Sequence, residues 1–198
     1  MPDGMKVRPL VLENALVRLE PLAPHHAADL LDAMDTETFR YMPSGPTALD
    51  RAGVGGYIES MRSRPNQLAF AVIDPGSGRA VGSTSFMNIR PEHRGLEIGC
   101  TWIRADRRGT GLNTAMKRLL LTHAFETLGA VRVELRTDAL NARSRRAIEK
   151  LGAVPEGVLR RQMVMPDGRL RDTAVYAVTD DRWPQVREQL AQTPGPMP

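Results

Sequence analysis

The sequence predicts an α/β domain whose central sheet is mixed, mostly antiparallel and flanked by helices. Two patterns predict it: short stretches in which apolar and polar residues alternate, as in half-buried strands, and longer stretches with apolar residues at helical spacing. Turn-forming residues separate several neighbouring strand-like stretches, which is typical of hairpins. Because 198 residues with 41% hydrophobic side chains suffice for one core, we expect a single domain over residues 8–190, with flexible termini at 1–7 and 191–198.

The first half of the chain predicts a strand, two helices and a hairpin. Residues 15–19 alternate as a strand, and residues 24–34 carry apolar side chains at helical spacing after a proline, which favours the first turn of a helix. Residues 48–61 predict a second helix, although each of its glycines weakens it by ~1 kcal/mol relative to alanine. Residues 68–73 and 80–88 flank a turn rich in Pro, Gly and Ser, so they predict a hairpin.

The second half alternates strands with helices and closes with another hairpin. Residues 94–104 predict a strand, and the chain from Leu112 predicts a helix that packs its apolar face on the sheet. The predicted order continues with a strand over 131–137, a helix over 142–151 that Gly152 ends in a left-handed cap, a hairpin of 157–164 with 170–178, and a short terminal helix.

A tight turn between the strand at 94–104 and the following helix is the strongest functional signal. It reads Arg107-Arg108-Gly109-Thr110-Gly111-Leu112-Asn113-Thr114. The two glycines let the backbone turn successive N–H groups inward, and the helix begins at once, so its unpaired amides and positive dipole end point the same way. With the two arginines beside it, the turn predicts a binding site for a diphosphate.

Two common nucleotide motifs do not fit this turn. A Walker loop needs a lysine directly after its last glycine, and the first lysine after Gly111 is Lys117, within the helix and out of register. A dinucleotide fingerprint needs a third glycine where Thr114 stands.

The turn instead resembles motif A of the GCN5-related N-acetyltransferases, Arg/Gln-x-x-Gly-x-Gly/Ala after a strand. The matching residues are Arg108, Gly111 and Asn113, and Asn113 departs from the pattern, which asks for a small residue. The resemblance implies that the loop amides hold the pyrophosphate of acetyl-coenzyme A. The cofactor-binding residues it implies here are Arg108, Gly109, Thr110, Gly111, Asn113 and Thr114.

A second stretch is similar to motif B of the same family. It begins at Asn141, continues through Ser144 and ends in Leu151-Gly152. Together with Glu97-Ile98-Gly99 and the stretch 171–176, it resembles the RimJ/RimL-like branch, over residues 17–183. The resemblance implies an acetyl-CoA-dependent transfer of an acetyl group to a primary amine, either a protein N-terminal α-amine or a small-molecule amine. It also implies that Asn141 contacts the pantetheine arm, although Asn141 can equally cap the helix that follows it.

The resemblance further implies a sheet with splayed central strands. The strand ending at Ile103 would separate from the strand at 131–137, with the pantetheine arm between them, and backbone N–H groups as far as Trp102 and Ile103 would donate to the thioester oxygen. Gly99 would ease the bulge that this needs, or it is an ordinary packing glycine.

The acid–base residues are less well defined. Glu97 is the first candidate for the base that deprotonates the amine, because it alternates away from its apolar neighbours, and Glu134 is the second. Each can instead be an ion-pair partner of a nearby arginine. Ser144 is the candidate that touches the thiol sulfur, or it is structural. Many relatives have a tyrosine as acid where this chain has Ile148, so a non-catalytic acyl-CoA-binding module is the alternative.

The composition restricts the other classes. The single cysteine, Cys100, excludes an internal disulfide, and with four histidines that lack ligand spacing it predicts no metal. Because Cys100 alternates toward the apolar face of its strand, we expect direct attack by the amine without an acyl-enzyme. The net charge of +4 suits an anionic co-substrate, whereas 5% aromatic residues make nucleic-acid binding a weak hypothesis. No stretch of ~18 apolar residues predicts a membrane span, so we expect a cytoplasmic protein, and the final hairpin suggests a homodimer.

Overall fold

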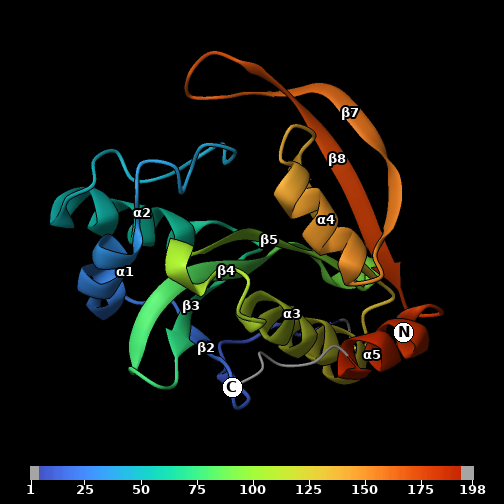
Figure 1. Ribbon diagram of the computed structural model, residues 1–198. Helices are drawn as coiled ribbons and strands as arrows, with labels where there is room; N and C mark the ends of the chain where they lie inside the picture. Colours follow the sequence, from blue (N-terminus) through green and yellow to red (C-terminus); the bar gives the residue numbers. More distant parts are fainter. Residues whose placement is uncertain (1–4, 193–198) are drawn as a thin grey trace.

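The computed structural model describes residues 5–192, and its strands form one open sheet of eight (Figure 1). Their order is β1-β2-β3-β4-β5-β6-β8-β7, and every neighbouring pair is antiparallel except the parallel pair β5 and β6. The strands are β1 (Leu12–Glu13), β2 (Arg18–Pro21), β3 (Leu68–Asp74), β4 (Arg79–Arg90), β5 (Gly95–Ile103), β6 (Arg132–Asp138), β7 (Val154–Val164) and β8 (Leu170–Thr179). The predicted mixed, mostly antiparallel sheet is confirmed.

Five α-helices cover the two faces of this sheet. They are α1 (Ala27–Ala33), α2 (Arg51–Ser63), α3 (Leu112–Thr122), α4 (Ala142–Lys150) and α5 (Trp183–Gln192), with a π-helical turn, His123–Thr127, after α3. The buried apolar residues of α3, α4 and α5 belong to one core cluster, and those of α1 and α2 belong to a second. The sheet therefore has an α3/α4 face and an α1/α2 face.

The predicted elements are all present, with differences at their ends. A short strand, β1, precedes the predicted first strand, and β7 begins three residues earlier than predicted, at Val154. Within the predicted flexible termini, Met5 is buried in the core and α5 continues to Gln192. The remaining terminal positions, 1–4 and 193–198, lie outside the described residues.

The centre of the sheet opens where β5 leaves β6. The two strands pair only at Gly95, Leu96 and Glu97, opposite Arg132, Val133 and Glu134. Beyond Glu97, the edge of β5 that faces β6 has no ladder partner among the described strands. The predicted splay is therefore present, and it leaves the backbone N–H and C=O groups on this edge of β5 without a strand partner.

A β-bulge in β5 lies within this opening. Ser83 pairs with Trp102 and Ser85 with Gly99, so one residue of β4 opposes two of β5, and Cys100 has a φ of +48°. The left-handed residue is thus Cys100 rather than Gly99, which corrects the expected role of Gly99. A Cβ on Gly99 would lie 2.5 Å from Met87 Sδ and 3.0 Å from Glu97 Oε1, so Gly99 leaves room for these side chains.

The bulge also reverses which face the following side chains occupy. Leu96 and Ile98 belong to the core on the α3/α4 face, whereas Trp102 belongs to the core under α1 and α2, with Cys100 packed against that core. The sequence predicted all four on one face. A single extra residue shifts the two-residue alternation of a strand, and no alternation rule detects that shift.

Candidate active site

The glycine turn after β5 presents unpaired backbone amides. Gly109 and Gly111 have φ angles of +80° and +84°, in the left-handed region that favours glycine, and Gly111 directly precedes α3. In the described part of the chain, the N–H groups of Gly109, Thr110 and Gly111 donate to no protein acceptor, and the first N–H groups of α3 have none within the helix. A Cβ on Gly109 would meet nothing within 4 Å. The turn therefore fits an anionic group such as a pyrophosphate.

Side chains of the turn hold this backbone in place. Arg108 Nε donates to the Ile103 carbonyl at 2.9 Å, and Thr110 Oγ1 donates to the Arg107 carbonyl at 2.8 Å. Arg107 forms an ion pair of 2.7 Å with Asp74, at the β3–β4 turn. Arg108 and Thr110 thus stabilise the loop itself. The remaining N–H groups of the Arg108 guanidinium make no hydrogen bond to a described residue, so they stay available for a ligand.

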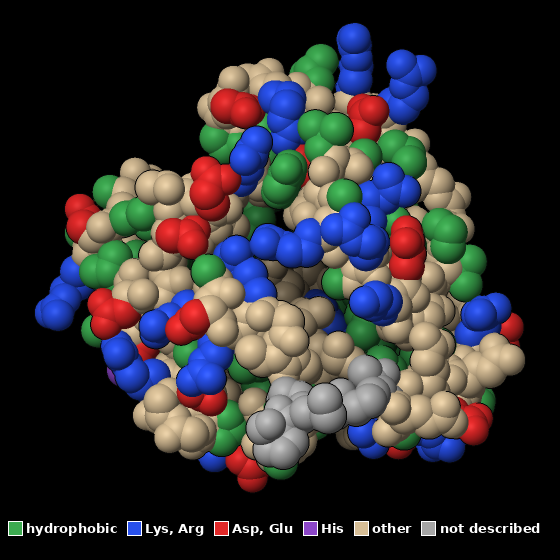
Figure 2. Space-filling model, in the orientation of Figure 1, with side chains coloured by type: hydrophobic (Ala, Val, Ile, Leu, Met, Phe, Trp, Pro, Cys, Tyr) green, Lys and Arg blue, Asp and Glu red, His purple; other side chains and the backbone are tan. Residues whose placement is uncertain are grey.

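Helix α4 follows β6 and packs on the α3/α4 face through Ile148. Asn141 caps it, because its Oδ1 accepts the Ser144 N–H at 3.0 Å. The capping role is therefore present, and the predicted contacts of Asn141 and Ser144 with a co-substrate stay predictions. Figure 2 shows a hollow between α3 and α4 in this face, with Lys and Arg side chains gathered along its edge.

The position of the missing tyrosine is apolar and closed. Ile148 is 7% exposed and belongs to the core cluster of the α3/α4 face. Tyr176 is 1% exposed, and its hydroxyl donates to Glu149 at 2.9 Å and accepts from Arg145 at 3.0 Å. Tyr176 is therefore a residue of the sheet core.

Glu97 is a buried carboxyl with few partners. It is 6% exposed on the α1/α2 face, accepts a hydrogen bond of 2.7 Å from Asn88 Nδ2, and lies 3.6 Å from Arg136 Nε. A second bulge, in β4, gives Asn88 a φ of +48° and brings its amide to Glu97. Burial raises the pKa of Glu97, and the opposing effects of Arg136 and Asn88 do not cancel it. A carboxylate whose pKa is raised is a stronger base than an ordinary one, so Glu97 accepts a proton more readily.

Glu134, directly opposite Glu97 on β6, has a different environment. Three arginines surround it: Arg90 at 2.7 Å, Arg136 at 2.6 Å and Arg132 at 3.2 Å. Burial alone would raise the pKa of Glu134, but hydrogen bonds from these arginines outweigh it and lower the pKa to about 2. Glu134 is therefore the ion-pair partner that the sequence allowed, and such a weakly basic carboxylate makes a poor proton acceptor.

The α1/α2 face beside Glu97 contains buried donors that lack partners. Arg171, on β8, is 5% exposed, and its only hydrogen bond to a described residue joins its guanidinium to the Tyr41 carbonyl at 3.3 Å. Its Nε and the Ser85 hydroxyl are buried without an acceptor. The tip of the β7–β8 hairpin thereby meets the segment between α1 and α2 (Figure 1). The sequence analysis did not single out Arg171, because a basic residue in a strand carries no signal of burial.

Cys100 and Lys117 lie on opposite sides of the bulge. Burial raises the pKa of the Cys100 thiol, which disfavours a thiolate and supports the expected direct attack, although the thiol lies on the face opposite to the one predicted. Lys117, on α3, is 5% exposed, and its Nζ donates to Thr101 Oγ1 at 2.7 Å. The helical spacing after Leu112 gave no sign that Lys117 would be buried.

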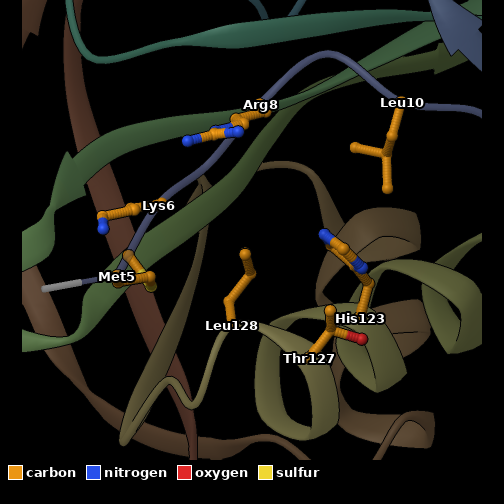
Figure 3. A pocket seen from close by; sticks show the side chains of 7 residues that line it. All are labelled: Met5, Lys6, Arg8, Leu10, His123, Thr127 and Leu128. Atoms are coloured by element: carbon orange, nitrogen blue, oxygen red, sulfur yellow. The ribbon is translucent and has the colours of Figure 1, made fainter. Parts of the chain in front are cut away.

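Two other features of the described residues lie away from this region. A pocket of about 370 Å³ lies between the segment of residues 5–10 and the π-helical turn (Figure 3), and no residue of the glycine turn lines it.

Potential metal-ligand atoms of Glu20, His25 and His26 lie within 4.8 Å of one another. His26 Nδ1 accepts the Ala23 N–H, so the proton is on Nε2 and donates to Glu20 at 2.9 Å. His26 is therefore a buried histidine paired with Glu20.

Comparison with known proteins places the chain in a family. The model of the acetyltransferase (GNAT) domain matches residues 17–154, which is more than half of the chain, so the chain belongs to the GNAT family. The fold agrees with solved structures. A GCN5-related N-acetyltransferase from Brucella melitensis is 31% identical, covers 96% of this chain and 87% of its own, and superimposes with a TM-score of 0.89.

Two further relatives carry more specific names. RimJ of Mycobacterium smegmatis, in complex with CoA-disulfide, is 25% identical, with a TM-score of 0.74 over 93% of this chain and 92% of its own. The "Putative ribosomal N-acetyltransferase YdaF" of Bacillus subtilis (strain 168) is 33% identical over 106 residues. That match spans 54% of this chain and 57% of the B. subtilis protein.

Proposed function

We propose that this protein is an acetyl-CoA-dependent N-acetyltransferase that transfers the acetyl group to a primary amine by direct attack in a ternary complex. The observation that carries the proposal is the row of unpaired amides at Gly109, Thr110 and Gly111, at the N-terminus of α3 and beside the splay of β5. The relatives named for acetyl transfer, and the RimJ structure with CoA-disulfide, support the same co-substrate. The Mycobacterium structure contains CoA-disulfide, and acetyl-CoA is the substrate proposed for this protein.

The residues of the chain divide between two substrates. On the α3/α4 face, the turn amides with Arg108, Asn113 and Thr114 hold the diphosphate, and Asn141 and Ser144 contact the pantetheine arm. The free backbone edge of β5, as far as Trp102 and Ile103, donates to the thioester oxygen. The Trp102 side chain itself is buried under α2, where its Nε1 donates to Tyr57 at 3.3 Å, so only its backbone serves this role.

The acceptor amine enters from the α1/α2 face. Glu97 takes its proton, directly or through water, because it is a buried carboxyl with a raised pKa beside the opening of the sheet. Arg171 and Ser85 supply the unpaired donors that position the acceptor. The names RimJ and ribosomal N-acetyltransferase among the relatives favour a protein N-terminal α-amine over a small-molecule amine.

None of the helices in residues 5–192 has the length and apolar character that a membrane-spanning helix needs.

The test combines binding and turnover. Calorimetry with coenzyme A is expected to show binding that weakens in an Arg108→Glu variant, because the reversed charge opposes a diphosphate. Thiol release from acetyl-CoA is then measured with peptides that carry a free or a blocked N-terminus. Release that depends on the free amine supports the enzyme. Binding without release for every amine tested favours the alternative, a non-catalytic acyl-CoA-binding module, for which Ile148 in place of a tyrosine is the specific argument.

A further inference from the structure

Lys117 is the buried charge on the α3/α4 face that the proposed mechanism has not used. It lies in the second turn of α3, is 5% exposed, and donates to Thr101 Oγ1 at 2.7 Å. Thr101 is the residue after Cys100 in the β5 bulge, and its hydroxyl lies 2.9 Å from Thr84 Oγ1 and 3.3 Å from the Gly99 carbonyl. The lysine therefore reaches from the helix to the point where the sheet opens.

The position of Lys117 relative to the glycine turn follows from helix geometry. It is six residues after Gly111 in the sequence, so it lies roughly 9 Å farther along the helix axis at 1.5 Å per residue. Suppose that a ligand binds its diphosphate at the glycine turn and extends its arm into the splay. The arm then passes between the turn and Lys117. The Nζ of Lys117 then lies beside the inner part of that arm, where a thioester would sit.

The ammonium group of Lys117 has unused hydrogen-bonding capacity. It carries three donor hydrogens, and Thr101 is its only acceptor among the described residues. The other two hydrogens are buried with no protein partner, which is costly unless a ligand supplies an acceptor. Glu97 and Cys100, both on β5, are the charged and titratable groups that act on it. Neither group forms a hydrogen bond with Lys117 Nζ, so two of its hydrogens are available to a substrate.

We propose that Lys117 is the proton donor to the leaving sulfur in acetyl transfer, in the role for which Ile148 leaves no side chain on α4. The proposal rests on the proposed function. Ile148 and Lys117 belong to the same face of the sheet, on α4 and α3 respectively, so either helix can place an acid beside the arm. Burial lowers the pKa of Lys117 to about 7, below the ~8.5 of an ordinary thiol. Transfer of a proton from this ammonium to a thiolate is therefore favourable.

The step balances in atoms and charge. The amine nitrogen forms a bond to the carbonyl carbon, and the carbon–sulfur bond breaks with its electron pair on sulfur. Lys117 gives one proton to that sulfur and is left as a neutral amine. The nitrogen loses one proton through Glu97 to water, and solvent returns one to Lys117. The products are the amide and the free thiol, with no oxidant or reductant involved.

Three variants separate this role from a structural one. Lys117→Met keeps the volume but removes the proton, and we expect kcat to fall by about 100-fold, the range of general acid catalysis. Thr101→Val removes the hydrogen-bond partner but keeps the ammonium, and we expect a loss under about 10-fold. Lys150→Met, at an exposed lysine of α4, is the matched control and should leave kcat and the affinity for coenzyme A unchanged.

Two readouts decide the proposal. The wild-type kcat should fall as pH rises through about 7, because the acid must be protonated, and this alkaline limb should vanish in Lys117→Met. Independently of turnover, Lys117 of the protein with bound coenzyme A, followed by NMR of its labelled side chain, should lose its proton at about pH 7, below the pH at which the thiol does.

The contrary outcomes are equally defined. A Lys117 side chain that keeps its proton above the pH at which the thiol titrates, or an alkaline limb that is unchanged in Lys117→Met, overturns the role of Lys117 while leaving the transferase intact. If Lys117→Met does not fold, a wild-type profile without an alkaline limb between pH 6 and 9 overturns it, and a limb that Thr101→Val displaces supports it. Absence of turnover by the wild type with every amine, despite binding of coenzyme A, overturns the proposed function and this inference with it.

Discussion

The two faces of the sheet at the splay differ in how they prepare for a ligand. On the α3/α4 face, unpaired donors come from backbone amides of a glycine turn and from one buried lysine. On the α1/α2 face, two opposed glutamates share a network with arginines, and the network satisfies Glu134 but leaves Glu97 with one amide and a more distant guanidinium. Glu97 and Glu134 are the same residue type and lie opposite each other on β5 and β6. The number of arginines around each carboxylate therefore decides whether it serves structure or proton transfer.

The largest effect on kcat is expected from removing the carboxyl of Glu97, which has fewer hydrogen-bond partners than Glu134. Glu97→Gln should lower kcat by about 100-fold or more, because the amide cannot accept the proton of the amine. Burial raises the pKa of Glu97, so the wild-type kcat should rise with pH at values above the ~4.3 of an ordinary glutamate, and the variant should lack this rise. Steady-state profiles with Glu92→Gln, an exposed glutamate, as control check it. A Glu97→Gln enzyme with the wild-type profile would remove Glu97 from the mechanism.

The opposed glutamate should affect stability. Glu134→Gln leaves Arg90, Arg132 and Arg136 without their shared carboxylate, and we expect a loss of about 1–3 kcal/mol in the free energy of unfolding, since the arginines are partly exposed. The folded pKa of about 2 lies below the unfolded value, ~4.3. The stabilisation is therefore complete above ~4.3 and disappears as pH falls toward 2. Urea titrations across this window should show wild type and variant converging at low pH.

A smaller effect should distinguish the glycine turn from an ordinary turn. Gly109→Ala adds a Cβ in open space at a φ of +80°, so its cost is backbone strain of about 1 kcal/mol. Because the strained loop is the proposed ligand cradle, we expect affinity for coenzyme A to fall a few-fold. Gly78→Ala, with a φ of +68° and equally open space in the β3–β4 turn, is the matched control. Gly78→Ala should lose similar stability and keep its affinity for coenzyme A. Equal affinities in the two variants would show that the glycine turn does not bind the ligand.

The smallest effect concerns the sheet edge that β7 forms, next to β8. Strand β7 is exposed along most of its length, and Val158, Leu159 and Val164 are 49%, 44% and 70% exposed. Homodimerisation through this hairpin stays a prediction. If it occurs, Val158→Lys should shift the mass measured by light scattering toward the monomer and leave kcat per active site unchanged, and a wild-type protein that is already monomeric would exclude it.

Local patterns were sufficient for the fold and for the loop. The alternation of 131–137, the helical spacing after Leu112 and the turn chemistry of the hairpins are short-range signals, and the structure has each of these elements. The glycine turn was predictable because two glycines next to a helix start restrict the backbone directly. The resemblance to motifs A and B added the family, which the comparisons confirm.

The side-chain arrangement was not predictable from the same patterns. The bulge at Cys100 depends on pairing with β4, so alternation alone assigned Trp102 and Cys100 to the wrong face. The burial of Lys117 and Arg171 depends on what packs over them, and a helix pattern with one lysine gives no sign of it. Glu97 and Glu134 were both candidates for the base because their arginine partners come from strands distant in sequence, such as Arg90.

The extra residue in β5 makes chain length matter more than residue identity along this strand. Removing one position between Gly99 and Trp102 would restore regular alternation, move Trp102 out of the packing beneath α2, and let the strand continue its ladder with β6. Backbone hydrogen bonds between β5 and β6 would then close the splay that admits a substrate. Insertions and deletions here should thus be far less tolerated than substitutions, which a deletion scan across residues 98–103 would reveal directly.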